Sequence, residues 1–387
     1  MKIKLAYCIP ALYNISGMEK TVTTKANYFA DILGYEVFIV TTDGKDREPA
    51  FELSEKIKVI NLDVNYDNIW KYSFFKKTFT YLIKQQIFKR RLKSLLKTIK
   101  PDITISMLRR EINFITKIND GSKKIGELHF NKSHYRDFDA TGKSFKFFRI
   151  LFARLWMKQL ISNLKRLDKF VVLSYEDKAK WHELDNVTVI YNPIDIIPDE
   201  TSDCNSRKVI AVGRIVRQKG FDMLLDSWKI VSARHPDWTL TIYGSGDKST
   251  LQEQAKVNGI CGNCFFEEPV LNLDEKFRES SIFAFSSRFE GFGMVISEAM
   301  ASGIPPVAFA CPCGPKDIIE DGKNGLLVEL GDIEGLADKI CYLIENSDVR
   351  KTFGKAARIR SEIFKIETIA KEWDQLFISL LEQKQTK

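Results

Sequence analysis

Short apolar runs alternate with longer amphipathic stretches along this chain, and this alternation restricts its fold more than any other feature. Apolar runs that fit buried strands occur in the first half at residues 3–10, 35–43, 56–64, 102–108, 122–130, 169–174 and 187–193. Further runs follow in the second half at residues 208–214, 238–244, 264–270, 281–287, 305–310 and 325–330. Helical patterns separate many of these runs, which indicates βαβ units and a parallel sheet in each half.

A chain of 387 residues is long enough for two domains of this kind. We therefore expect an α/β protein with two Rossmann-like domains, residues 1–193 and 194–364, that face a central cleft. Residues 365–387 follow the completed second sheet and are predicted to form a helix that crosses back to the first domain. Ligands of open α/β sheets bind beyond the carboxyl ends of the strands, so the cleft is the expected site.

Hydropathy and cysteine content limit where such a chain works. No apolar run approaches the ~20 residues of a membrane-spanning helix, and the first residues do not fit a signal peptide, so we expect a cytoplasmic protein. The seven cysteines, an odd number, argue against a disulfide framework and favour reduced thiols. The alternative is a zinc site of Cys261, Cys264, Cys311 and Cys313. No His lies near, however, and Cys311 and Cys313 are too close in sequence for the usual spacing of zinc ligands.

The positive charge is confined to the first half. Residues 1–195 carry 35 Lys and Arg against 22 Asp and Glu, whereas residues 196–387 carry 24 against 29. Residues 71–100 hold ten basic residues and residues 141–167 hold seven, in both cases without an acid and interleaved with Phe, Leu and Ile. Such segments suit an anionic membrane surface, and ordinary helices with solvated Lys and Arg are the alternative. Nucleic acid is disfavoured, because no known binding motif accompanies them.

One chemistry-bearing motif follows a second-half strand, where Gly213 and Gly220 bracket Arg214, Arg217 and Lys219. Glycine lets the backbone approach a ligand closely, while Arg and Lys together suit a diphosphate. The alternative is a solvated loop, since Arg and Lys are common in loops. On its own, this motif leaves both interpretations open.

A second motif, from Glu290 to Glu298, also joins a strand to a helix through glycines. Free backbone N–H groups near Phe292, Gly293 and Met294 are suited to bind anions or hydroxyl oxygens. Carboxylates accept hydrogen bonds from vicinal diols, so Glu290 and Glu298 suggest a ribose or another sugar. The alternative is that both acids complement a helix dipole, which explains Glu298 better than Glu290.

With these motifs, the chain resembles a family 4 retaining glycosyltransferase of the GT-B fold, of the type that builds bacterial surface polysaccharides. The resemblance rests on G-R-x4-K-G at 213–220, E-x7-E at 290–298, CPCGPKDII at 311–319 and GMEK at 17–20. It covers nearly the whole chain. Ser16 stands where the family usually has the first of two glycines in its first loop.

The resemblance implies roles for individual residues of the second domain. Arg214 and Lys219 would neutralise the donor diphosphate, and Glu290 would bind hydroxyls of the donor sugar, so that all three serve catalysis. Backbone amides at 292–294 would contact that sugar or the phosphate. Glu298 would bind the ribose hydroxyls.

The same resemblance assigns three further positions. Gly17 would let the first loop approach the diphosphate, and the segment 266–270, with Val270 at its end, would lie beside the base, which we expect to be uracil. His129 occupies the place where the family often has a His that faces the reacting sugar. A catalytic role and a structural role near the cleft both remain open for His129.

The implied activity is the transfer of a hexose from a nucleotide sugar, expected to be UDP-linked, to a growing lipid-linked glycan. The anomeric configuration would be retained, with the leaving phosphate accepting the proton of the acceptor hydroxyl. Residues 71–100 and 141–167 would hold the enzyme on the inner face of the cytoplasmic membrane. Many other sugar transferases hold a metal ion with an Asp-x-Asp string, and Asp137-Phe138-Asp139 fits that string. It lies far in sequence from the diphosphate motifs, so we expect no metal and no other cofactor.

Three other interpretations compete with this one. The first is a GT-B glycosyltransferase that acts on a soluble sugar or a small metabolite. The second is a scaffold on a degenerate transferase fold, which the intact cationic and acidic motifs disfavour. A nicotinamide dehydrogenase is disfavoured too, since the chain lacks the G-x-G-x-x-G fingerprint.

Overall fold

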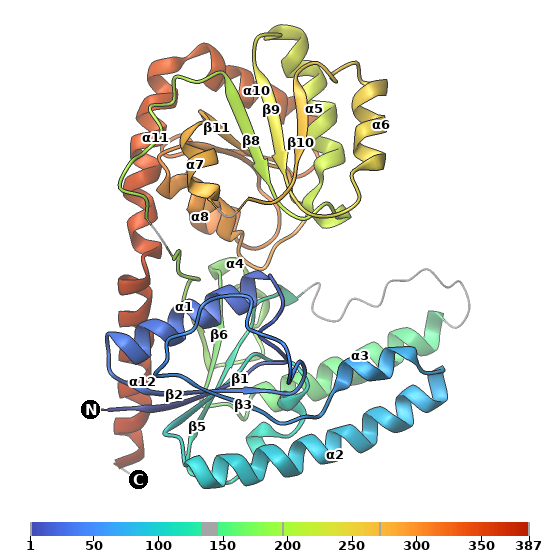
Figure 1. The fold of residues 1–387 in the computed structure, drawn as a ribbon, viewed down its shortest axis with the longest axis vertical. Coiled ribbons are helices and arrows are strands. Elements are labelled where there is room, and N and C mark those ends of the chain that lie inside the picture. Colours follow the sequence, from blue (N-terminus) through green and yellow to red (C-terminus); the bar gives the residue numbers. More distant parts are fainter. Residues whose placement is uncertain (1, 133–145, 196, 271, 386–387) are drawn as a thin grey trace. The chain divides into compact units, whose positions relative to one another are not determined.

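The computed structural model describes residues 2–132, 146–195, 197–270 and 272–385, and it divides the chain into two compact units (Figure 1). The first unit consists of Met1–Leu173, Asp177–Pro193 and Ile369–Lys387, and the second of Ser174–Glu176 and Ile194–Thr368. The Asp137-Phe138-Asp139 string lies outside the described residues, and so do residues 141–145 of the second basic segment. Each unit contains one parallel sheet.

The sheet of the first unit has seven parallel strands in the order β3-β2-β1-β4-β5-β6-β7. Its strands are β1 (Lys4–Cys8), β2 (Glu36–Thr41), β3 (Lys58–Asn61), β4 (Ile103–Ser106), β5 (Lys123–Glu127), β6 (Lys169–Val172) and β7 (Val187–Val189). Each strand falls inside an apolar run of the sequence. Strands β1, β4 and β6 are buried almost throughout, as expected for a parallel sheet covered on both faces.

Helices cover both faces of this sheet. They are α1 (Gly17–Asp31), the 3-10 helix η1 (Tyr66–Lys71), α2 (Phe74–Ile99), two short 3-10 turns at 111–113 and 115–117, α3 (Lys146–Leu164) and α4 (Tyr175–Lys180). One core joins alternate residues of the strands, such as Ala6 and Cys8, to Leu92 of α2 and Leu160 of α3. Because side chains alternate across a strand, Tyr7 faces the opposite side.

That opposite side carries α12 (Ile366–Gln385), the last helix of the chain. Its residues from Ile369 onward belong to the first unit, so the predicted return of the C-terminal helix is confirmed (Figure 1). Phe377 is fully buried and meets Phe29 of α1 edge-on, with ring centroids 5.5 Å apart. Tyr35 also donates a hydrogen bond to Asp374. These contacts bury the apolar stripe of the helix.

The sheet of the second unit has six parallel strands in the order β10-β9-β8-β11-β12-β13. Its strands are β8 (Lys208–Val212), β9 (Thr239–Tyr243), β10 (Cys264–Glu267), β11 (Ile282–Phe285), β12 (Pro306–Phe309) and β13 (Leu326–Val328). Its helices are η5 (Arg217–Lys219), α5 (Phe221–Arg234), α6 (Ser249–Val257), α7 (Leu273–Arg278), α8 (Met294–Ala301), α9 (Pro315–Ile318), α10 (Ile333–Glu345), α11 (Ser347–Ser361) and η6 (Glu362–Phe364). This is the doubly wound arrangement that the sequence predicts.

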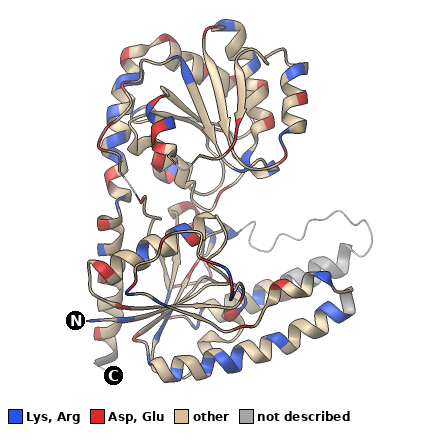
Figure 2. Ribbon diagram, in the orientation of Figure 1, with Lys and Arg blue, Asp and Glu red and all other residues tan. Residues whose placement is uncertain are grey.

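The basic helix α2 has two apolar stripes rather than one. Phe88, Leu92 and Leu96 face the core of the first unit and are nearly inaccessible. A second set on the opposite side, led by Phe79 and Leu82, stays exposed by 67% and 57%. Figure 2 shows basic residues repeated along the same helix. Within the described residues, none of the helices has the length and apolar character that crossing a membrane requires.

Candidate functional site

In the second unit, the two motif-bearing loops lie side by side because they follow neighbouring strands. Strands β8 and β11 are paired, with Val209 opposite Ile282, so the loops at their carboxyl ends share one edge of the sheet. Gly220 makes this approach possible. Its φ is +64°, and a Cβ atom there would stand 2.1 Å from the carbonyl oxygen of Ser286. No larger residue fits this position without moving the backbone.

Lys219 and Glu290 form an ion pair across the two loops. The Lys219 Nζ lies 2.7 Å from the Glu290 Oε1, and the two side chains are exposed by only 15% and 9%. The phenyl ring of Phe285 lies beneath the ammonium group, 5.8 Å from the Nζ. The sequence predicts both residues as site residues but does not predict that they touch. A cation and a carboxylate at the carboxyl edge of a parallel sheet can bind a phosphate and a hydroxyl of one ligand.

Three further residues hold the two loops together. Gln218 donates from its Nε2 to the carbonyl oxygen of Phe289 at 3.0 Å, and the Arg288 backbone N–H donates to the Gln218 carbonyl at 2.8 Å. Arg288 also forms a bidentate pair with Asp222 of α5, with N–O distances of 2.7 and 2.5 Å. The Arg288 guanidinium holds the pKa of Asp222 below its ordinary value. These contacts hold the two loops against each other.

Helix α8 begins directly behind Glu290. Gly293, with a φ of +92°, is the residue before its first turn, and Met294 is its first residue. Phe292 is buried, and its carbonyl oxygen would lie 1.7 Å from a Cβ at Gly314. This close approach joins the helix start to the 311–319 segment. Because the first turn of a helix has unpaired N–H groups, this end of α8 is suited to an anion or a hydroxyl oxygen.

The other residues predicted in the second unit surround this core less closely. Arg214 is exposed in the loop after β8, Glu298 is half-buried on α8, and Val270 is exposed by 36% just after β10. All three follow or lie near carboxyl ends of strands in the same sheet. They therefore lie at the same edge of the sheet as the Lys219–Glu290 pair.

In the first unit, the predicted glycine loop leads into α1, and Gly17 is the first residue of that helix. Glu19 is buried and accepts hydrogen bonds from Ser16 and from the Asn14 Nδ2, the latter at 3.3 Å. Ser16 thus contributes a hydrogen bond where the family usually has a glycine. Gly17 itself is exposed.

His129 lies just beyond the carboxyl end of β5, and its side chain is exposed by only 5%. Its Nε2 is 3.0 Å from the Oε1 of Glu127, which also forms a buried ion pair with Lys25 of α1. The Lys25 ammonium stands 4.4 Å above the indole ring of Trp373 on α12. Sequence reasoning finds His129 but not these partners, which come from three separate segments, β5, α1 and α12.

Charges in this network compensate one another. Burial alone would raise the pKa of Glu127, but Lys25 and His129 outweigh it and hold the pKa at about 2. Burial lowers the pKa of Lys25. The second oxygen of Glu127 and the hydroxyl of Tyr7 are buried without a hydrogen bond among the described residues. Removing either Lys25 or Glu127 would therefore leave the charge of the other buried without its main partner.

The described residues contain few side chains that could act together as metal ligands. In that part of the chain, no group of three or more His, Cys, Asp or Glu residues is placed to hold an ion. All seven cysteines are free thiols, and Cys261 alone is exposed. Burial raises the pKa of Cys311 and of Cys264. Cys261 and Cys264 thus do not join Cys311 and Cys313 in the zinc site considered from the sequence.

Two doubly wound parallel α/β units in one chain are the architecture of the GT-B class of enzymes. The family model described as "Glycosyltransferase Family 4" matches residues 15–197, and that described as "Glycosyl transferases group 1" matches residues 194–360. The chain belongs to the family 4 glycosyltransferases of the GT-B fold.

Relatives in sequence agree with this family, and solved structures agree with its fold. An uncharacterized glycosyltransferase of Haemophilus influenzae is 29% identical over 96% of this chain and 98% of its own length. The amylovoran biosynthesis glycosyltransferase AmsD of Erwinia amylovora is 35% identical over 54% of this chain and 62% of its own length. A TarM variant of Staphylococcus aureus, solved with fondaparinux, alpha-GlcNAc-glycerol and UDP, superposes with a TM-score of 0.76 at 19% identity, over 97% of this chain and all of that chain. Sucrose-phosphate synthase of Thermosynechococcus elongatus gives a TM-score of 0.79 at 18% identity, over 98% and 99%.

Proposed function

We propose that this protein is a retaining hexosyltransferase that moves a sugar from a UDP-linked donor to a growing glycan in bacterial surface polysaccharide biosynthesis. The Lys219–Glu290 pair beside the start of α8 is the observation that carries the proposal. A positive and a negative group at one sheet edge match a ligand that has both phosphates and sugar hydroxyls. The relative AmsD, named for amylovoran biosynthesis, supports the pathway.

The proposed mechanism relies on positioning and on charge stabilisation rather than on a strong base. Arg214 and Lys219 would face the diphosphate and stabilise the charge that develops when it leaves. Glu290 would hold hydroxyls of the donor sugar, and Glu298 would take those of the ribose. The leaving phosphate oxygen would accept the proton of the attacking hydroxyl on the same face, which retains the anomeric configuration.

Donor binding tests this assignment directly. We expect one UDP-sugar from a panel of UDP-, GDP- and ADP-sugars to bind saturably, with EDTA present or absent. Arg214→Ala should weaken that binding by about tenfold to a hundredfold, since a charge-assisted contact to phosphate is lost. Arg217→Ala is the matched control, because it removes another exposed guanidinium of the same loop. Equal effects of both variants would contradict the role of Arg214.

His129 is proposed to face the reacting sugar. A buried imidazole with one nitrogen held by Glu127 has a fixed orientation, which suits a group that faces a reacting sugar. We expect His129→Gln to lower kcat while UDP affinity stays unchanged. Unchanged kcat would leave His129 with only a structural role, as the alternative interpretation has it.

The membrane surface is the proposed location of the acceptor, which would then be lipid-linked. Phe79, Leu82 and Ile83 form an exposed apolar stripe on α2, a helix that has basic residues and no acid. This combination favours shallow insertion into an anionic bilayer on the cytoplasmic side.

Vesicle flotation tests the location. The wild-type protein should bind anionic vesicles at low salt and lose binding as salt rises, and Phe79→Ser with Leu82→Ser should abolish it. Ile359→Ser is the control, because Ile359 is another exposed apolar residue, accessible by 72%, on α11 of the second unit. Full activity on a water-soluble acceptor, without any vesicle binding, would favour the alternative of a soluble sugar or small-metabolite acceptor.

A further inference from the structure

A cavity of about 460 Å³ lies within the first unit, on the edge of its sheet where the strands end. Five residues of its wall each follow a different strand. They are Tyr13 after β1, Asp43 after β2, Asp67 after β3, Arg110 after β4 and Phe130 after β5. The volume falls within the range of small-molecule sites. These five residues lie outside the donor motifs, whereas Met18 and Glu19 of the 17–20 segment also line the cavity.

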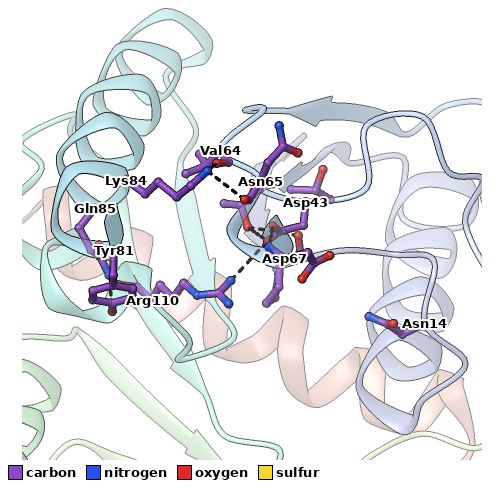
Figure 3. A network of polar contacts seen from close by, with 12 residues as sticks. Asn14, Asp43, Val64, Asn65, Asp67, Tyr81, Lys84, Gln85 and Arg110 are labelled. Atoms are coloured by element: carbon purple, nitrogen blue, oxygen red, sulfur yellow. Dashed lines mark hydrogen bonds and ion pairs between the residues drawn. The ribbon is translucent and has the colours of Figure 1, made fainter. Parts of the chain in front are cut away.

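Asp43 fixes the geometry of one wall of the cavity (Figure 3). Its side chain is exposed by only 2%, and it accepts hydrogen bonds from the Asp67 backbone N–H at 3.0 Å and from the Arg110 guanidinium at 3.3 Å. Arg110 also stacks on the ring of Tyr66, 4.0 Å from its centroid. Asp67 and Arg110 are therefore held in place by a buried carboxylate and an aromatic ring, as a preorganised site requires.

Asp67 and Arg110 still have hydrogen-bonding capacity to offer. The exposed Asp67 accepts from the Tyr13 hydroxyl on one oxygen, and its other oxygen has no hydrogen bond among the described residues. Arg110 uses one terminal nitrogen for Asp43, and the rest of its donor fork has no hydrogen bond within the same described part of the chain. An acceptor and a fork of donors thus lie on one wall.

The charges of the cavity do not select an anion. Among the described residues, its lining has three carboxylates, Glu19, Asp43 and Asp67, against two guanidinium groups, Arg109 and Arg110. Phosphate and uronate groups are bound best by Arg and Lys side chains that are not already balanced by neighbouring carboxylates. Paired donors and acceptors suit a ligand whose groups both donate and accept, which is the property of sugar hydroxyls.

Aromatic rings supply the other surface that a sugar needs. Tyr13, Phe130 and Trp156 line the cavity together with Tyr81. The Arg109 guanidinium covers one face of Phe130, 4.4 Å from the ring centroid, which holds that ring in place. Aromatic side chains bury the apolar faces of a ligand while their polar neighbours bind its edges.

We propose that this cavity binds a neutral sugar residue of the acceptor glycan, with Asp67 and Arg110 as its hydroxyl-binding residues and Tyr13 as the residue that orients Asp67. This inference rests on the proposed glycosyltransferase function and adds the chemistry of the acceptor. It excludes an acceptor that presents a phosphate or a uronate to this cavity.

Saturation-transfer NMR on the full chain tests the proposal with methyl glycosides of glucose, galactose and N-acetylglucosamine, compared with methyl glucuronide and glycerol phosphate. We expect at least one neutral glycoside to bind and the two anionic probes not to bind. Asp67→Ala should weaken the neutral binding by about tenfold or more, through loss of a charged hydrogen-bond acceptor. Tyr13→Phe should weaken it less.

Asp46→Ala is the matched control, since Asp46 is exposed in the same unit and lies outside this cavity. Stronger binding of an anionic probe, no binding of any neutral glycoside, or neutral binding unaffected by Asp67→Ala would each overturn the proposal. UDP-sugar binding, measured in parallel, should be the same in all variants. If UDP-sugars bind but the cavity fails its test, the acceptor assignment is wrong and the transferase function stands. If no nucleotide sugar binds, the proposed function fails.

Discussion

Replacing Lys25 with Met should destabilise the first unit more than any surface change. Lys25 and Glu127 are each exposed by only 1%, and the second oxygen of Glu127 is already buried without a hydrogen bond among the described residues. Met retains most of the apolar volume of Lys but removes the positive charge. Glu127 would then keep a buried charge with only His129 as a partner. Breaking a buried pair in this way costs about 3–5 kcal/mol of unfolding free energy.

The cost should depend on pH in a direction that follows from Glu127. In the wild type, its folded pKa of about 2 lies below the ordinary 4.5, so the pair stabilises the fold above pH 4.5 and this contribution is lost as pH falls toward 2. Without Lys25, burial should raise that pKa above 4.5. The variant should therefore be least stable, relative to the wild type, at neutral pH, and the difference should shrink as pH falls toward 4.5.

Urea unfolding at several pH values measures this difference, and hydrogen–deuterium exchange of α1 and β5 peptides assigns it to the first unit. Lys25→Met combined with Glu127→Met should recover most of the loss, because no unpaired charge remains. Lys56→Met is the control, since its pair with Asp31 at 3.1 Å is 64% and 39% exposed and should cost less than about 1 kcal/mol. A loss for Lys25→Met as small as that of the control, or one that does not change with pH, would refute the reasoning.

Three further outcomes follow from packing and exposure. Gly220→Ala should destabilise the second unit, because its Cβ would collide with the Ser286 carbonyl. Gly259→Ala is also at positive φ but has nothing within 4 Å, so it should cost only the roughly 1–2 kcal/mol of the left-handed conformation. Thermal unfolding compares the two variants, and equal shifts in melting temperature would contradict the contact. Phe377→Ala should cost about 3–5 kcal/mol in urea unfolding, since the side chain is fully buried on α12, and a loss below about 1 kcal/mol would mean that this helix is not docked. In the native protein a thiol reagent should label Cys261 quickly and the six buried cysteines only after unfolding, with mass spectrometry as the readout, and rapid labelling of a second cysteine would contradict the packing.

The sequence by itself determined the architecture to a large extent. Every strand that the structure describes falls inside an apolar run, because a strand in a covered parallel sheet must bury both of its faces. Short helices without a strong periodic pattern, such as α4 and α7, were not predicted, since six residues are too few to establish a period. The glycine-flanked loops at 213–220 and 290–298 were also predictable, because glycines and charged residues are identified directly from the sequence.

Only the tertiary structure decided which side chains meet. Lys219 and Glu290 are 71 residues apart, and Lys25 and Glu127 are 102 apart, yet both pairs touch because parallel strands bring distant loops or helices together. Asp43, Asp67 and Arg110 have no shared motif and meet only at the common carboxyl edge of the first sheet. In the same way, the apolar residues of α2 look alike in the sequence, but packing buries Phe88 and leaves Phe79 exposed. The order of residues determines which chemical groups are neighbours along the chain, whereas burial and pairing depend on which surfaces the fold places in contact.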